Sequence, residues 1–181
     1  MSVKELQATL EILAKVKSDA APGDRWKEAL NKIAAHISQL FKVTEREVAI
    51  LLRTDDGNHL KFVFPLALSE GPNSFPLASP SVAGEVTKAG RGVVDNVFAQ
   101  TKHLSFYERM KLEGPKAGPI QKMLVAPLRG TGLPLGVIEV SRKGADAAAA
   151  GPDFTQQDLA VLTEIGAAVI PYLQQLKPKI L

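Results

Sequence analysis

The sequence predicts an α+β fold in which one antiparallel sheet carries long helices on one face and short helices plus loops on the other. Three observations support this prediction. Two turn signals, at residues 54–58 and 129–132, each join two apolar runs and so predict hairpins. Amphipathic helices are predicted at both ends of the chain. Short helical segments and one short strand are predicted between the two hairpins.

Two helices are predicted ahead of the first hairpin. The first repeats apolar residues at steps of three and four, the spacing of a coiled-coil seam: Val3, Leu6, Leu10 and Leu13. The second is predicted to begin at an N-cap, Asp24, and to bury one face: Trp26, Leu30, Ile33, Ile37 and Leu40. The second and last helices are expected to pack on the sheet, which leaves the first helix with the least apolar surface to cover within the chain. Residues 1–20 are therefore expected to be a dimerisation arm, and residues 21–181 a single domain.

The first hairpin joins two strands of different character. Residues 47–53 form a continuous apolar run, which predicts a strand covered on both faces. Residues 59–64 alternate instead, with one side formed by Leu60, Phe62 and Phe64. Pro65 is expected to end this strand, and residues 66–79 are predicted to be a long loop.

The middle of the chain is predicted to hold short elements. A serine cap and a proline in the first turn predict a helix over residues 79–90. A short edge strand is expected at residues 93–94, and capping-box spacing predicts another helix at residues 105–112. Residues 113–119, with two Gly-Pro steps, are a predicted loop.

The second hairpin, residues 123–141, leads through a linker at residues 147–150 to the last helix. Thr155 is expected to cap this helix, with Asp158 as the acid at its third position. Its apolar side comprises Leu159, Leu162, Ile165, Val169, Leu173 and Leu176. Pro171 removes one backbone hydrogen bond and is expected to kink the last turns.

The composition excludes several classes of function. Of the 181 residues, 45% are apolar and 23% are charged, as in ordinary soluble domains. There is no cysteine, which excludes disulfides, thiolate catalysis and zinc–thiolate sites and fits a cytoplasmic protein. The net charge of +3 is dispersed, so no nucleic-acid partner is expected. No apolar run approaches the roughly 20 residues of a membrane span, so no membrane association is expected.

Patterns typical of catalysis or metal binding are missing from the sequence. The three histidines, His36, His59 and His103, are far apart and have no ligand-like spacing. The glycines of residues 130–136 join strand to strand, whereas a dinucleotide motif joins strand to helix. No enzyme activity is therefore expected.

Residues 122–128, 135–140 and 152–159 together resemble the C-terminal half of a GAF domain. Leu135 to Val140 is similar to the family strand "iGvlel", and Phe154 to Leu159 to the family helix start "Ft..D..lL". Residues 79–90 are similar to the small helix beside the family's pocket. The resemblance extends over residues 25–176. It implies a GAF-like (profilin-like) sheet of five or six strands, a ligand cavity on the small-helix face, and dimerisation through the terminal helices.

The sequence also departs from several GAF subfamilies. Cyclic-nucleotide-binding members carry an Asn-Lys…Phe…Asp-Glu signature, but Phe106 is followed by Met110 and Lys111 where Asp-Glu is expected. Bilin-binding members attach their chromophore through a cysteine, and free-methionine sulfoxide reductases need cysteines for their chemistry. Neither group fits a chain without cysteine. The resemblance therefore implies a non-catalytic domain without a thiol-linked cofactor.

The resemblance places the predicted ligand-binding residues on the small-helix face: Ser79, Ser81, Phe75, Leu77, Asn96, Phe98, His103, Phe106, Arg109 and Met123. Serine hydroxyls and free amides at a helix N-terminus suit a carboxylate or phosphate, although Ser79 alternatively caps its own helix. Arg109 is a candidate partner for an anion, and His103 for a hydrogen bond. Glu139, an acid within an apolar strand, is either buried or at a solvated sheet edge.

Two functions follow as hypotheses. The first is a sensory domain that binds a small metabolite, with an anion as one candidate, and signals as a homodimer to a separate partner protein. The second is a scaffold that acts through dimerisation and protein contacts. In the scaffold, the cavity is filled by Phe62, Phe75, Phe98 and Phe106.

Overall fold

The computed structural model describes residues 2–71, except 16–21, together with residues 73–100 and 118–178. Its centre is one six-stranded antiparallel sheet in the order β3-β2-β1-β6-β5-β4, which confirms the predicted α+β fold. The strands are β1 (Val48–Arg53), β2 (His59–Phe64), β3 (Ser74–Pro76), β4 (Val93–Asp95), β5 (Ile120–Leu128) and β6 (Gly136–Lys143).

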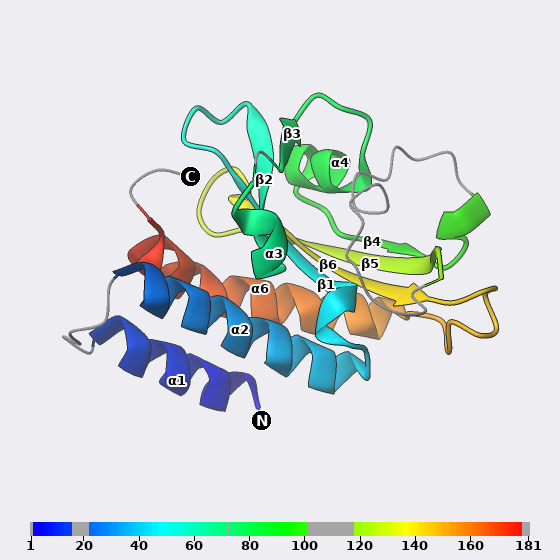
Figure 1. Cartoon of the computed structure of the whole chain (residues 1–181), viewed down its shortest axis with the longest axis horizontal. Coiled ribbons are helices and arrows are strands. Elements are labelled where there is room, and N and C mark those ends of the chain that lie inside the picture. The colour runs from blue at the N-terminus through cyan, green and yellow to red at the C-terminus, as the bar shows by residue number, and fades with distance from the viewer. Residues whose placement is uncertain (1, 16–21, 72, 101–117, 179–181) are drawn as a thin grey trace.

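Two long helices, α2 (Pro22–Phe41) and α6 (Gln156–Leu176), cover one face of the sheet. Helix α1 (Val3–Lys15) packs against both of them and forms an outer layer (Figure 1). By length and composition alone α6 is apolar enough to cross a membrane. Its apolar side lies in the core between helices and sheet, however, and that packing accounts for its composition.

Short elements lie over the other face of the sheet, as Figure 1 shows for α4. They are the helices α3 (Leu66–Ser69) and α4 (Val82–Ala89) and the 3₁₀ turn η2 (Phe98–Gln100). A further 3₁₀ turn, η1 (Glu45–Glu47), precedes β1. We call this side of the sheet the small-helix face.

Several local predictions were wrong in detail. The expected loop at residues 66–79 contains both α3 and β3. Helix α2 begins at Pro22, so Asp24 lies in its first turn instead of capping it, and Leu40 is exposed. Phe64 packs in the helix-side core, away from Leu60 and Phe62, because the register shifts where β1 pairs with β2.

The second hairpin and the last helix follow the prediction closely. Thr155 accepts a hydrogen bond from the amide of Asp158 at 3.0 Å, and the Asp158 carboxylate accepts one from the amide of Thr155 at 2.7 Å. Gly136 begins β6 where it pairs with β1, and an added Cβ there would overlap the carbonyl oxygen of Leu51. The glycine therefore permits the pairing of the two central strands.

Candidate functional site

The small-helix face carries its own apolar core, separate from the core beneath the long helices. We call it the small-helix cluster. It comprises Ala49, Leu51, Leu60, Phe62, Leu68, Phe75, Val82, Ala83, Val86, Phe98, Ile120, Met123, Val125 and Val137, with Leu77 packed against it. The rings of Phe62 and Phe75 are tilted to each other, with centroids 6.2 Å apart. Strands β1, β5 and β6 and helix α4 thus contribute apolar side chains to one packed cluster.

Four predicted site residues meet in this cluster. Phe75 comes from β3, Phe98 from η2 and Met123 from β5, and all three are buried. Leu77 follows β3 and is partly buried against them. Three other predicted residues, His103, Phe106 and Arg109, lie outside the described residues, as does the expected helix at residues 105–112.

The two serines have structural roles at the start of α4. The hydroxyl oxygen of Ser81 accepts a hydrogen bond from the amide of Gly84 at 3.1 Å, which makes Ser81 the N-cap. Ser79 lies two residues earlier, and its amide donates to the carbonyl of Pro76 at 2.9 Å. The sequence had placed the cap at Ser79. The hydroxyl oxygen of Ser81 and the amide of Gly84 are therefore already hydrogen-bonded to each other within the chain.

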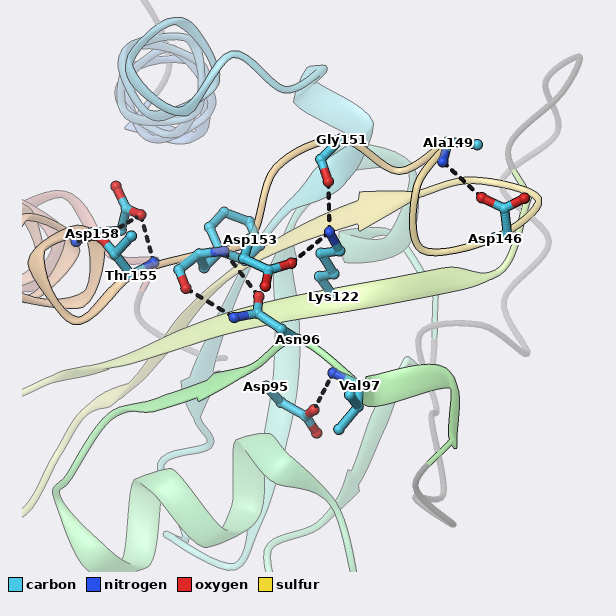
Figure 2. A network of polar contacts seen from close by, with 11 residues as sticks. Asp95, Asn96, Val97, Lys122, Asp146, Ala149, Gly151, Asp153, Thr155 and Asp158 are labelled. Atoms are coloured by element: carbon cyan, nitrogen blue, oxygen red, sulfur yellow. Dashed lines mark hydrogen bonds and ion pairs between the residues drawn. The ribbon is translucent and has the colours of Figure 1, made fainter.

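Asn96 belongs to a different part of the molecule from the predicted site. Its side-chain amide donates to the carbonyl of Phe154 at 2.9 Å, and its side-chain oxygen accepts from the amide of Phe154 at 2.9 Å. Figure 2 shows Asn96 beside the loop that leads into α6. The side-chain nitrogen and oxygen of Asn96 are thus both hydrogen-bonded to the backbone of Phe154. We therefore assign Asn96 to the support of that loop and not to the ligand site.

Lys122 supports the same loop from β5, a contact that sequence reasoning missed. Its ammonium donates to the carbonyl of Gly151 at 2.6 Å and pairs with Asp153 at 2.7 Å (Figure 2). The Lys122 side chain is only 6% exposed, although it lies within a strand of mostly apolar residues. The composition of the strand gave a signal, because a buried lysine needs a polar or charged partner.

Glu139 is the one acid among the buried polar residues on the described sheet. It lies on the central strand β6, opposite Ala49 of β1 and Val125 of β5, both members of the small-helix cluster. Its side chain therefore points to the small-helix face, and only 7% of the residue is exposed. The sequence had left open a solvated sheet edge, which the central position excludes.

The surroundings of Glu139 disfavour its ionised form. Burial raises the pKa of Glu139 to about 7, from an ordinary value of 4.5. Within the part of the chain that the structure describes, no donor forms a hydrogen bond or ion pair with this carboxyl group. Glu139 is thus a buried carboxyl group without a partner among the described residues, a feature that is concentrated at functional sites.

Comparisons with known proteins agree with this architecture. The family model described as "GAF domain" matches residues 24–170. The GAF domain of a phosphoenolpyruvate-protein phosphotransferase from Coxiella burnetii is similar, with 9% identity, a TM-score of 0.66, and 95% of this chain and 92% of that chain covered. The corresponding domain from Acinetobacter has 14% identity, a TM-score of 0.63, and coverage of 96% and 95%.

An enzyme of the same fold is also similar in structure. Free methionine-R-sulfoxide reductase from Neisseria meningitidis, in complex with its substrate, has 17% identity and a TM-score of 0.60, with 97% of this chain and 90% of that chain covered. These identities show a shared fold. No curated protein matches the chain. The family match spans the sheet, α4 and most of α6, and the chain belongs to the GAF domain family.

Proposed function

We propose that this chain is a non-catalytic sensory domain that binds a small molecule on its small-helix face. The observation that carries the proposal is Glu139, a buried carboxyl group that faces the apolar cluster without a partner among the described residues. Burial of such a group lowers stability unless something pairs with it. Strongly perturbed carboxyl groups in apolar surroundings are concentrated at functional sites.

An anionic ligand, as expected from the sequence, does not fit the surroundings of Glu139. That expectation rested on Ser79, Ser81 and Arg109, and the Ser81 oxygen is already used by the Gly84 amide. An anion bound beside Glu139 would also be repelled whenever that carboxyl group is ionised. The ligand is therefore expected to be neutral or cationic.

The sheet offers a short route from the ligand to the helices. On β6, Glu139 and Val137 face the small-helix cluster, whereas Ile138 and Val140 lie in the core shared with α6. A ligand that repositions β6 therefore acts directly on the packing of α6. We propose that this change alters a homodimer formed through the terminal helices, which signals to a separate partner protein.

Ligand binding is tested with a metabolite library, using thermal shift followed by calorimetry. We expect at least one compound to raise the melting temperature of the wild type. Ala49→Val, which adds two methyl groups beside Glu139, should weaken its binding about tenfold or more. Ala126→Val adds the same groups on the helix side of β5 and is the matched control. A library without any binder, or equal binding by Ala49→Val, would contradict the proposal.

The second candidate function is a scaffold without a ligand. It is favoured by one observation: Phe62, Phe75 and Phe98 are all buried in the small-helix cluster, three of the four aromatic residues expected to fill a cavity. Phe106, the fourth, lies outside the described residues. The same library separates the two candidates, because a scaffold gives no specific binder.

A homodimer, if formed through α1, must use a face other than the predicted seam. Leu6 and Leu10 are fully buried within the chain. The outer side of α1 presents a shallow groove lined by Ala8, Glu11, Ile12 and Lys15, and Ile12 is 63% exposed. We therefore propose Ile12 as the centre of the dimer contact.

Light scattering after size-exclusion chromatography tests this contact. The wild type is expected to be a dimer and Ile12→Asp a monomer, because a carboxylate buried at an apolar contact is costly. Leu133→Asp is the control, since Leu133 is 70% exposed on the turn between β5 and β6. A monomeric wild type, or a dimeric Ile12→Asp, refutes the assignment.

A further inference from the structure

We propose that Glu139 binds the cationic head group of the ligand, a compact ammonium or amidinium whose apolar body packs in the small-helix cluster. This inference rests on the proposed function and deepens it, because it assigns a chemical class to the ligand. It reverses the charge expected from the sequence.

Glu139 lies on the central strand β6 between one directly opposed residue on each neighbouring strand. In an antiparallel sheet, directly opposed residues have Cβ atoms about 4.5–5.5 Å apart. The opposed residues are Ala49 and Val125, neither of which has a side-chain donor. The side chain of Ala49 is a single methyl group and so contributes no polar atom beside the carboxyl group.

The elements packed around Glu139 carry several charged residues. On α4, the charged residues Glu85 and Lys88 are exposed. On β5, Lys122 pairs with Asp153 on the opposite face of the sheet. On η1, Glu47 accepts a hydrogen bond from the amide of Lys143 at 3.0 Å. Among the described residues, then, no side chain supplies a positive charge to Glu139.

Ser141 is a second buried polar residue on the same face of the sheet. Ser141 lies two residues beyond Glu139 on β6, about 7 Å along the strand, and is buried. Its hydroxyl donates to the carbonyl of Glu47 at 3.3 Å, which leaves the hydroxyl oxygen as an acceptor. Glu139 and Ser141 thus present acceptors, which suits a ligand rich in N–H donors.

A cation is a stronger partner for the Glu139 carboxylate than a neutral hydrogen-bond donor is. A charged hydrogen bond in an apolar environment is roughly twice as strong as a neutral one, and an ammonium of ordinary basicity stays charged up to about pH 10. The neighbouring cluster residues provide the apolar surface that ligand pockets use for the remainder of a small molecule.

The pairing also predicts a pH dependence of affinity. Burial raises the pKa of Glu139 to about 7. The ionised fraction of such a group increases from about one-tenth at pH 6 to about nine-tenths at pH 8. Affinity for a cation is therefore expected to rise about tenfold over this range, whereas affinity for a neutral analogue should stay constant.

The test uses three probes that share one body: n-hexylammonium, 1-hexanol and hexanoate. Each is titrated into protein whose glutamate carboxyl carbons are labelled with ¹³C, and binding is followed by NMR. We expect n-hexylammonium to bind at least tenfold more tightly than 1-hexanol and to shift the Glu139 signal. Hexanoate is expected not to bind. Glu139→Gln should weaken n-hexylammonium binding at least tenfold and change 1-hexanol binding less than twofold. Glu85→Gln, on the exposed side of α4, is the matched control.

The outcomes separate this inference from the proposed function. If n-hexylammonium does not bind, or if Glu139→Gln binds it equally well, the cation assignment is overturned. The proposed function is then still tested by the metabolite library and by the binding of its ligand to Ala49→Val. A library ligand without a cationic group would uphold the function and refute the assignment made for Glu139.

Discussion

Replacement of Glu139 by glutamine is expected to stabilise the ligand-free protein by about 3 kcal/mol at pH 8 and to change its stability little at pH 4. The pKa of Glu139 is raised from 4.5 to about 7 by burial. The native state therefore binds this proton more tightly than the unfolded state does. The stabilisation by that proton is complete below about pH 4.5 and is lost as the pH rises through 7. Glutamine has nearly the same shape and no charge to bury at any pH.

Urea unfolding at pH 4, 6 and 8 measures this difference directly. The free energy of unfolding of the wild type should fall from pH 4 to pH 8 relative to that of Glu139→Gln. Glu164→Gln, at an exposed position of α6, is the control and should show no such trend. A variant less stable than the wild type at pH 8 would mean that Glu139 has a partner in solution, and the ligand argument would fail with it.

The two effects of Glu139→Gln are expected to have opposite signs. The variant should be more stable without ligand, yet bind a cationic ligand more weakly. That combination distinguishes a residue kept for binding from one that serves packing, since removal of a packing residue lowers stability. Both measurements use the same variant, which is expected to fold at least as well as the wild type.

The parts of the fold that depend on local signals could be predicted from the sequence. Both hairpins, the cap of α6 at Thr155 and the end of α4 at Gly90 follow from turn and cap chemistry. β3 and α3 could not be predicted, because elements of three and four residues depend on tertiary pairing. Phe75, for example, is in a strand because it pairs with Leu60.

The candidate site was predictable only in its apolar part. Phe75, Phe98 and Met123 were assigned to the small-helix face through the family resemblance, and they lie there. The apolar residues around Lys122 indicate that this lysine needs a partner, but the partners of Asn96 and Lys122 lie far away in the sequence, so no local pattern identifies those partners. For Glu139, the sequence revealed an acid in an apolar strand, but its burial depends on the order of the strands.

Phe154→Ala is expected to lower the free energy of unfolding by about 4 kcal/mol, in the range for truncation of a buried phenylalanine. Phe154 is 3% exposed and packs edge-on against Phe41, with ring centroids 6.4 Å apart. The guanidinium carbon of Arg142 lies 4.6 Å from the centre of the Phe154 ring. Truncation removes the aromatic contact and the cation–π contact together and leaves a cavity at the start of α6.

Chemical denaturation of a small set of variants separates the ring of Phe154 from its backbone. Phe154→Leu retains most of the apolar volume and should lose about 1–2 kcal/mol. Asn96→Ala keeps the ring but leaves the amide and carbonyl of Phe154 without their partners, for an expected loss of about 2 kcal/mol. Because ring and backbone belong to one residue, the double variant should lose less than the sum of the single losses. Strict additivity, or a loss below about 1 kcal/mol for Phe154→Ala, would show that Asn96 and the ring do not hold the loop together. In that case the loop before α6 is held mainly by Lys122, and Lys122→Met becomes the variant that releases it.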